Sequence, residues 1–160
     1  MGEQKNSALA FEKRLPPVTR RPAPVRGDEK ESRLEVAVVF TSPAATMAAL
    51  RKAGVLASSL NARINLLVPQ VVPYPAPLES PPVLLDFTEQ WFREIAAQSP
   101  VETAVQIFLC RDPAGTLRSV LAPRSLVVIG GRKRWWATRE KSLARKLRRA
   151  GHDVIFTETE

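Results

Sequence analysis

Glycine and basic residues meet in one stretch of the chain, VIGGRKRWWATREKSLARKLRRAG, which begins at Val128. The apolar run that ends at Gly130 and Gly131 indicates a buried strand, and the residues that follow are typical of a helix. Parallel α/β domains hold phosphates at such turns, because small residues let a ligand approach the backbone N–H groups at a helix start. Here cations and two tryptophans fill the next positions, so the stretch indicates either a phosphate site or a cationic surface.

The basic residues are concentrated in this stretch. The formal net charge of the 160-residue chain is +8. It is +3 over residues 1–33, zero over 34–131, +8 over 132–150 and −3 over 151–160. A net surplus equal to the charge of one segment predicts a surface for an anionic partner, which is a nucleotide, a nucleic acid or a membrane surface. A basic helix that covers a sheet is also often only a solvated face, and this alternative stays open.

Cations with two tryptophans between them make up this candidate surface, which we call the basic segment (residues 132–149). Indole rings beside cations suit stacking on bases or insertion at the depth of lipid headgroups. Its members are Arg132, Lys133, Arg134, Trp135, Trp136, Arg139, Lys141, Arg145, Lys146, Arg148 and Arg149.

Residues with catalytic or metal-binding chemistry are few. His152 is the single histidine and Cys110 the single cysteine, and neither stands in a spacing typical of a nucleophile–base pair or a metal site. Asp112 precedes Pro113, which predicts a helix cap rather than a catalytic acid. We therefore expect a binding protein that is not an enzyme and holds no metal ion. The lone cysteine fits a reducing cytoplasm.

The rest of the chain predicts the elements that position these residues. Apolar runs predict strands over residues 34–40, 63–68, 103–110, 125–129 and 153–157. Helices are predicted between them, over residues 43–61, 83–98, 113–121 and 138–150. The alternation predicts an α/β fold, a Rossmann-like, doubly wound sheet of five parallel strands with helices on both faces.

The first 33 residues differ from this pattern. They are rich in charges and proline and have no periodic apolar residues, so a disordered basic tail is predicted over 1–33 and a single domain over 34–160. No apolar run reaches the roughly 18 residues that a spanning helix needs, and no leader segment is evident. We therefore expect a cytoplasmic protein without a transmembrane segment.

Two segments of the predicted domain resemble the universal stress protein family. VAVVFTSPAATMAALRKAGVLASSLNARINLLV is similar to the family's first strand, alanine-rich helix and second strand, and FLCRDPAGTLRSVLAPRSLVVIGGR to its Gly-Asp-Pro, helix and strand passage. The resemblance covers residues 34–157. It implies a doubly wound domain with a role in the stress response, and a homodimer formed through the last strand, here Val154, Ile155 and Phe156.

The resemblance also implies where ATP would bind, and there this chain departs from the pattern. Nucleotide-binding members of the family carry Gly-x2-Gly-x9-Gly-(Ser/Thr) after the fourth strand. Gly130 matches the first glycine, but Lys133 stands at the second, and the passage before the helix ends in Glu140, Lys141 and Ser142. Phe40 stands where the family has its first-strand aspartate. The resemblance therefore implies a degenerate ATP site, and we expect no cofactor.

Nucleotide binding stays open as an alternative, because arginine and lysine side chains can replace a glycine cradle around a phosphate. ATP or AMP would then be held between the ends of the first and fourth predicted strands. The candidate contacts are Thr41, Ser42, Val68, Gly130, Gly131, Arg132 and Ser142.

Overall fold

The structure is a computed structural model that describes residues 9–18, 34–72, 85–136 and 138–159. Strands and helices alternate along these residues from β2 to the end, as the sequence predicts. The elements are β1 (Leu9–Val18), β2 (Glu35–Val39), α1 (Pro43–Leu60), β3 (Arg63–Val71), α2 (Leu85–Ala97), β4 (Thr103–Cys110), α3 (Pro113–Val120), β5 (Leu126–Arg132), α4 (Arg139–Arg149) and β6 (Asp153–Thr159).

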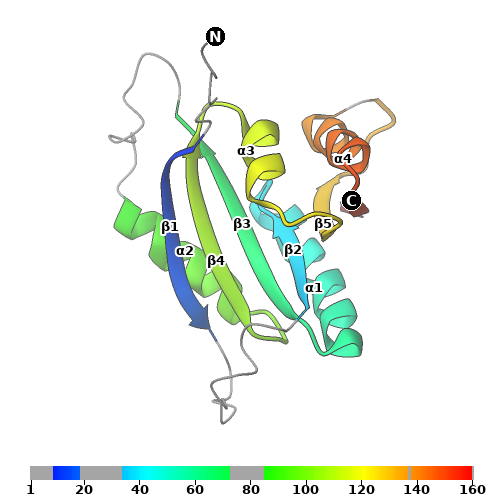
Figure 1. The fold of residues 1–160 in the computed structure, drawn as a ribbon. Coiled ribbons are helices and arrows are strands. Elements are labelled where there is room, and N and C mark those ends of the chain that lie inside the picture. The colour runs from blue at the N-terminus through cyan, green and yellow to red at the C-terminus, as the bar shows by residue number, and fades with distance from the viewer. Residues whose placement is uncertain (1–8, 19–33, 73–84, 137, 160) are drawn as a thin grey trace.

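All of these strands belong to one sheet, in the order β1-β4-β3-β2-β5-β6 (Figure 1). The strands β2 to β6 run parallel to their neighbours within this group. Counted from β2, their order across the sheet is third, second, first, fourth and fifth, so the chain winds outward from β2 in both directions. The predicted doubly wound α/β fold with five parallel strands is confirmed.

Strand β1 corrects one part of the prediction. It pairs antiparallel with β4 at the edge of the sheet and lies inside the segment that the sequence predicts to be disordered. The register shifts between Leu15 and Val18, where Pro16 and Pro17 stand, and proline is tolerated in edge strands and bulges because no second neighbour needs its N–H. Prolines and a lack of apolar periodicity therefore did not exclude a strand here. The rest of the predicted tail, residues 1–8 and 19–33, lies outside the described residues.

Two apolar cores hold the helices on opposite faces of the sheet. In Figure 1, α1 and α2 lie behind the sheet, and α3 and α4 lie in front of it. The core behind the sheet includes Leu50 of α1 and Phe92 of α2, packed with the sheet residue Ile64. The core in front includes Leu117 of α3 and Leu147 of α4. Because side chains alternate between the faces of a strand, β2 to β5 contribute to both cores, which explains their continuous apolar runs.

The start and end of α1 follow from local sequence. Ser42 caps the helix, since its Oγ accepts a hydrogen bond from the Ala45 N–H at 3.4 Å, and Pro43 fits the first turn. The helix ends at Asn61, whose φ of 50° lies in the left-handed region. The Ser42 cap places the beginning of α1 directly after β2, beside the end of β5.

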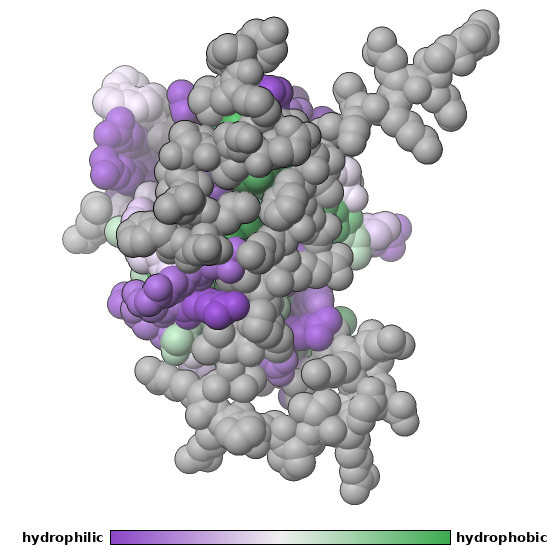
Figure 2. All heavy atoms as spheres, turned by 90° about the vertical axis from the view of Figure 1, so that its left-hand side faces the viewer, coloured by the Kyte–Doolittle hydropathy of each residue, from purple (hydrophilic) through white to green (hydrophobic). Residues whose placement is uncertain are grey.

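The side of the molecule that carries β1 is seen in Figure 2. Most of its coloured surface is hydrophilic, and hydrophobic residues show mainly near the middle. No helix among the described residues combines the length and the apolar character that crossing a bilayer requires.

Candidate anion-binding site

The carboxyl ends of β2 and β5 lie side by side at the point where the chain reverses its direction of winding. β2 pairs with β3 on one side and with β5 on the other. Ligands of open α/β sheets bind in the crevice outside such a point, since the connections from the two strands leave in opposite directions. The candidate residues after both strands are therefore brought to the same edge of the sheet.

The hydroxyl groups that follow β2 already have structural partners. Thr41 Oγ1 donates a hydrogen bond to the Gly130 carbonyl at 2.7 Å, and the Thr41 N–H donates to Thr46 Oγ1 at 3.1 Å. Ser42 Oγ caps α1. These bonds tie the start of α1 to β5, so Thr41 and Ser42 stabilise the edge where a ligand would have to enter.

Packing explains the glycine pair. A Cβ atom at Gly130 would lie 2.0 Å from the backbone oxygen of Ala45 in the first turn of α1. A Cβ atom at Gly131 would lie 2.4 Å from Phe156 Cζ and 3.2 Å from Glu140 Cβ. Both positions therefore need glycine because α1, β6 and α4 approach the backbone there. The space next to both glycines is therefore filled by atoms of α1, β6 and α4.

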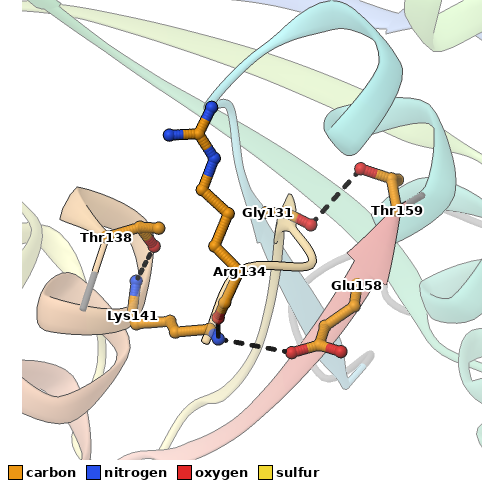
Figure 3. Close-up of polar contacts among 6 residues, drawn as sticks. All are labelled: Gly131, Arg134, Thr138, Lys141, Glu158 and Thr159. Carbon is orange, nitrogen blue, oxygen red and sulfur yellow. Dashed lines mark hydrogen bonds and ion pairs between the residues drawn. The ribbon is translucent and has the colours of Figure 1, made fainter. Parts of the chain in front are cut away.

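The backbone after the glycine pair continues the sheet. β5 extends to Arg132, which pairs with Thr159 of β6, and the Lys133 N–H donates to the Thr159 carbonyl at 2.9 Å. Thr159 Oγ1 also donates to the Gly131 carbonyl at 3.3 Å (Figure 3). In a phosphate loop the N–H groups point at the ligand, whereas here the N–H of Lys133 bonds to a strand.

The first turn of α4 is held in place from two sides. Thr138 caps the helix, with its Oγ1 accepting from the Lys141 N–H at 3.2 Å. Lys141 Nζ donates to the Arg134 carbonyl and lies 3.4 Å from Glu158 Oε1 of β6, while the Arg134 guanidinium points away from this cluster (Figure 3). The Lys141 charge is therefore directed inward, unlike that of Arg134.

Two hollows open on either side of this turn, and Arg139 and Glu140 line both of them. The first, which we call the inner hollow, has a volume of about 390 Å³. Its other lining residues are Phe40, Thr41, Pro69, Asp112, Pro113, Ala114, Ser142, Leu143 and Lys146. The second, which we call the outer hollow, has a volume of about 460 Å³. Its other lining residues are Ser42, Gly131, Arg132, Arg134, Trp136 and Thr138.

The candidate nucleotide contacts are thus divided between two places. Thr41 and Ser142 line the inner hollow, whereas Ser42, Gly131 and Arg132 line the outer one. Val68 is 3% exposed and belongs to the core behind the sheet. Sequence order alone did not reveal this division, because it depends on how α4 packs against Gly131.

Phe40 marks a second change at the same edge. Its ring packs against Trp91 and Phe92 of α2, with centroids 5.6 Å and 4.9 Å apart. The residue that replaces the expected family aspartate therefore contributes to the core behind the sheet. Trp91 is a packing residue of the same core.

The basic segment is largely exposed. Arg132 lies at the surface at the end of β5, followed by the exposed Lys133 and Arg134. The exposed cations of α4 are Arg139, Arg145, Lys146, Arg148 and Arg149. Ala144 and Leu147 face the core, which leaves the charged side chains on the remaining helix surface. Lys141 alone among the described cations of the segment is half-buried.

The two tryptophans of the segment differ sharply from Trp91. Trp135 is 91% exposed and Trp136 is 51% exposed. Their ring centroids are 5.3 Å apart with planes at 63°, and the Arg134 guanidinium lies 5.7 Å from the Trp136 centroid. The sequence indicated tryptophans beside cations, and their exposure became evident only in the structure.

Three residues have side chains with catalytic potential, and each has a place in the fold: His152, Cys110 and Asp112. His152 is buried, and its Nδ1 accepts a hydrogen bond from the Ser125 N–H at 3.1 Å. Burial raises the pKa of the Cys110 thiol, a hydrogen bond with Thr116 lowers it, and the charge of Asp112 raises it further. Asp112 occupies the predicted cap position of α3, although its side chain makes no cap hydrogen bond. Within the described residues, no group of three or more potential metal ligands is placed to hold an ion.

Strand β6 forms the edge of the sheet opposite β1. The residues expected at a dimer interface, Val154, Ile155 and Phe156, are half-buried there. The Arg148 guanidinium donates to the Val154 carbonyl through Nη2 at 3.0 Å and Nε at 3.4 Å. The Val154 carbonyl at this edge is therefore already hydrogen-bonded within the chain.

Comparisons with known proteins agree with the fold. No protein-family model matches the chain, and no curated protein has a matching sequence. A solved structure of a protein from the universal stress protein family of Burkholderia pseudomallei is similar, with a TM-score of 0.53 and 21% identity. The similarity covers 78% of this chain and 96% of that one. The resemblance expected from the sequence is thus confirmed at the level of the fold.

Proposed function

We propose that this chain is a non-enzymatic protein of the universal stress protein type that regulates other components during stress, and whose basic segment binds an anionic partner. It holds no cofactor and acts in the cytoplasm. The fold supports the first part of the proposal only as an analogy, since one fold serves many functions. The second part rests on the exposed cations of residues 132–149.

One observation carries the proposal that ATP is not held in the standard way. Glu140 Cβ lies 3.2 Å from the position that a Gly131 Cβ would take, so the first turn of α4 packs directly on the glycine pair. A phosphate group would need this space and the backbone donors behind it. With the turn in place, the candidate contacts lie in separate hollows.

Calorimetric titration with ATP, with and without magnesium and at low and physiological salt, tests this proposal. We expect no saturable binding at physiological salt. Saturable binding that is lost in the variant Ser142→Ala with Arg132→Ala would overturn it, since these residues line different hollows and a ligand touching both must displace the turn. The variant Ser58→Ala with Arg51→Ala is a matched control, because it removes the same groups from the exposed surface of α1.

A nucleotide in the inner hollow is the second candidate function. The hydroxyl groups of Thr41 and Ser142 and the cations of Arg139 and Lys146 line this one space. Its carboxylates, Asp112 and Glu140, oppose the binding of a triphosphate. AMP or adenosine would carry less charge into the hollow than ATP. AMP titration of Lys146→Ala against the unaltered chain distinguishes this candidate, since binding there must weaken when the cation is removed.

A homodimer through β6 belongs to the same proposal. Antiparallel pairing of two edge strands would satisfy the outward N–H and C=O groups around Phe156. Since Arg148 occupies the Val154 carbonyl, we expect a weak dimer that Arg148→Ala strengthens. Sedimentation at micromolar concentration measures this, and a strict monomer in both forms contradicts it.

A further inference from the structure

The outer hollow places arginine and indole side chains around one space. Arg132, Arg134 and Arg139 line it together with Trp136, and Thr138 caps the helix that begins there. Glu140 contributes the single acidic side chain of the lining. Three guanidinium groups against one carboxylate, at the start of a helix, favour an anion with several oxygen acceptors, such as a phosphate group.

The tryptophans beside this hollow expose apolar surface to water. Trp91 shows what an indole does elsewhere in the chain, since it packs against Phe40 and Phe92. Trp135, at 91% exposure, lies next to the Trp136 ring and leaves most of its own ring in solvent. Transfer of this surface from water to a less polar environment is favourable, so the partner of the surface should offer such an environment next to negative charge.

Ring geometry distinguishes two classes of anionic partner. Single-stranded nucleic acids bind by stacking successive bases on aromatic faces, and stacked bases have nearly parallel planes. The planes of Trp135 and Trp136 meet at 63°, and the Arg134 guanidinium lies over the Trp136 ring. The two indoles therefore cannot stack on neighbouring bases together. A membrane interface does not require parallel ring planes, because indoles bind there at the depth of the headgroups whatever the angle between the two rings.

We propose that the outer hollow binds the phosphate of an anionic phospholipid, while Trp135 and Trp136 enter the headgroup region of the membrane. Arg132, Arg134 and Arg139 contact the headgroup phosphate, and the exposed cations of α4 add long-range attraction to the negative surface. This inference rests on the proposed function, because it names the partner of the basic segment.

Co-sedimentation with vesicles tests the partner. The probes are vesicles of phosphatidylcholine alone, vesicles of equal parts phosphatidylcholine and phosphatidylglycerol, and a single-stranded DNA oligonucleotide, all at physiological salt. We expect binding to the mixed vesicles that far exceeds binding to the neutral vesicles and to the oligonucleotide. Preferred binding to the oligonucleotide, or equal binding to both kinds of vesicle, overturns the inference.

Matched variants locate the interaction. Arg132→Ala with Lys133→Ala should weaken vesicle binding about tenfold, since each basic side chain near an anionic surface adds to the attraction. Arg51→Ala with Lys52→Ala removes the same charge from the exposed surface of α1 and should change binding little. Equal losses in the two variants mean that net charge alone drives binding, which overturns the assignment to the outer hollow.

Fluorescence tests the entry of the indoles. In the variant Trp91→Phe, all tryptophan fluorescence comes from Trp135 and Trp136. Their emission should shift to shorter wavelength on mixed vesicles, and brominated lipids should quench it, because the rings leave water. Trp135→Ala with Trp136→Ala should weaken binding about tenfold through the loss of buried apolar area. Vesicle binding without a shift, without quenching and without loss in this variant overturns the inference.

The outcomes separate this inference from the proposed function. Saturable ATP binding that is lost in Ser142→Ala with Arg132→Ala contradicts the proposed function whatever the vesicles show. Binding of the oligonucleotide without binding of vesicles leaves the basic segment as an anionic-partner surface and rejects the lipid. Absence of binding to every anionic probe at physiological salt rejects both.

Discussion

The inner and outer hollows share Arg139 and Glu140 but differ in the rest of their lining. The inner hollow has two cationic and two acidic side chains and reaches toward α3. The outer hollow has two further arginines and an exposed indole. A single turn of α4, packed on Gly131, separates them. The edge of the sheet beyond β2 and β5 therefore carries two separate spaces with different chemical preferences.

Close packing on Gly130 and Gly131 holds α1 and the first turn of α4 where they separate the two hollows. We expect Gly130→Ala to lower the free energy of unfolding by about 3 kcal/mol, because a Cβ there meets the Ala45 backbone oxygen, which cannot move without α1. The displaced α1 would shift Thr41 and Ser42 and so alter both hollows. Urea unfolding measures the effect.

Gly131→Ala is the matched comparison. Its nearest neighbour is the far end of the Phe156 ring, which is half-buried and can turn aside. The loss in unfolding free energy should therefore be about 1 kcal/mol smaller than for Gly130→Ala. Equal losses would mean that α4 and β6 are held as rigidly as α1, and that the outer hollow is less adaptable than its openness to the surface indicates.

Variants specific to each hollow show which of the two binds anionic vesicles. Arg132→Ala with Arg134→Ala affects only the outer hollow, and Ser142→Ala with Lys146→Ala affects only the inner one. We expect the first pair to weaken binding to anionic vesicles about tenfold and the second pair to leave it nearly unchanged. A reversed result would make the inner hollow the binding site.

Lys141 gives the smallest expected effect. Its ion pair with Glu158 is partly exposed, with side-chain exposures of 27% and 42%, so Lys141→Ala should lower the unfolding free energy by only about 0.5 kcal/mol. Vesicle binding should hardly change, because this ammonium group is directed toward Glu158 and the Arg134 carbonyl. A loss as large as that of the Arg132 and Arg134 variant would show that the contacts of Lys141 hold the residues of the outer hollow in place. Lys52→Ala on α1 is the control for a change of one exposed charge.

Several features of the fold were predictable from local patterns. The apolar runs that form β2 to β6 have no polar alternate face, which is typical of strands buried on both sides. The helix predicted from residue 43 begins where α1 begins, since the Ser42 cap and the fixed φ of Pro43 act within one turn. Strand β1 was missed, because its pairing depends on the free edge of β4 and not on its own periodicity.

The order of the elements from β2 to β6, the concentration of charge in residues 132–149 and the changes from the expected nucleotide motif at Phe40 and Lys133 follow from the sequence alone. The tertiary structure was needed to find that Glu140 packs on Gly131, that Lys141 turns inward and that Trp135 stays in solvent. Residue type sets which charges and which backbone angles are possible, over a few positions of chain. Whether a group meets a ligand, water or another helix depends on contacts between segments that are distant in sequence, such as α4 and β5.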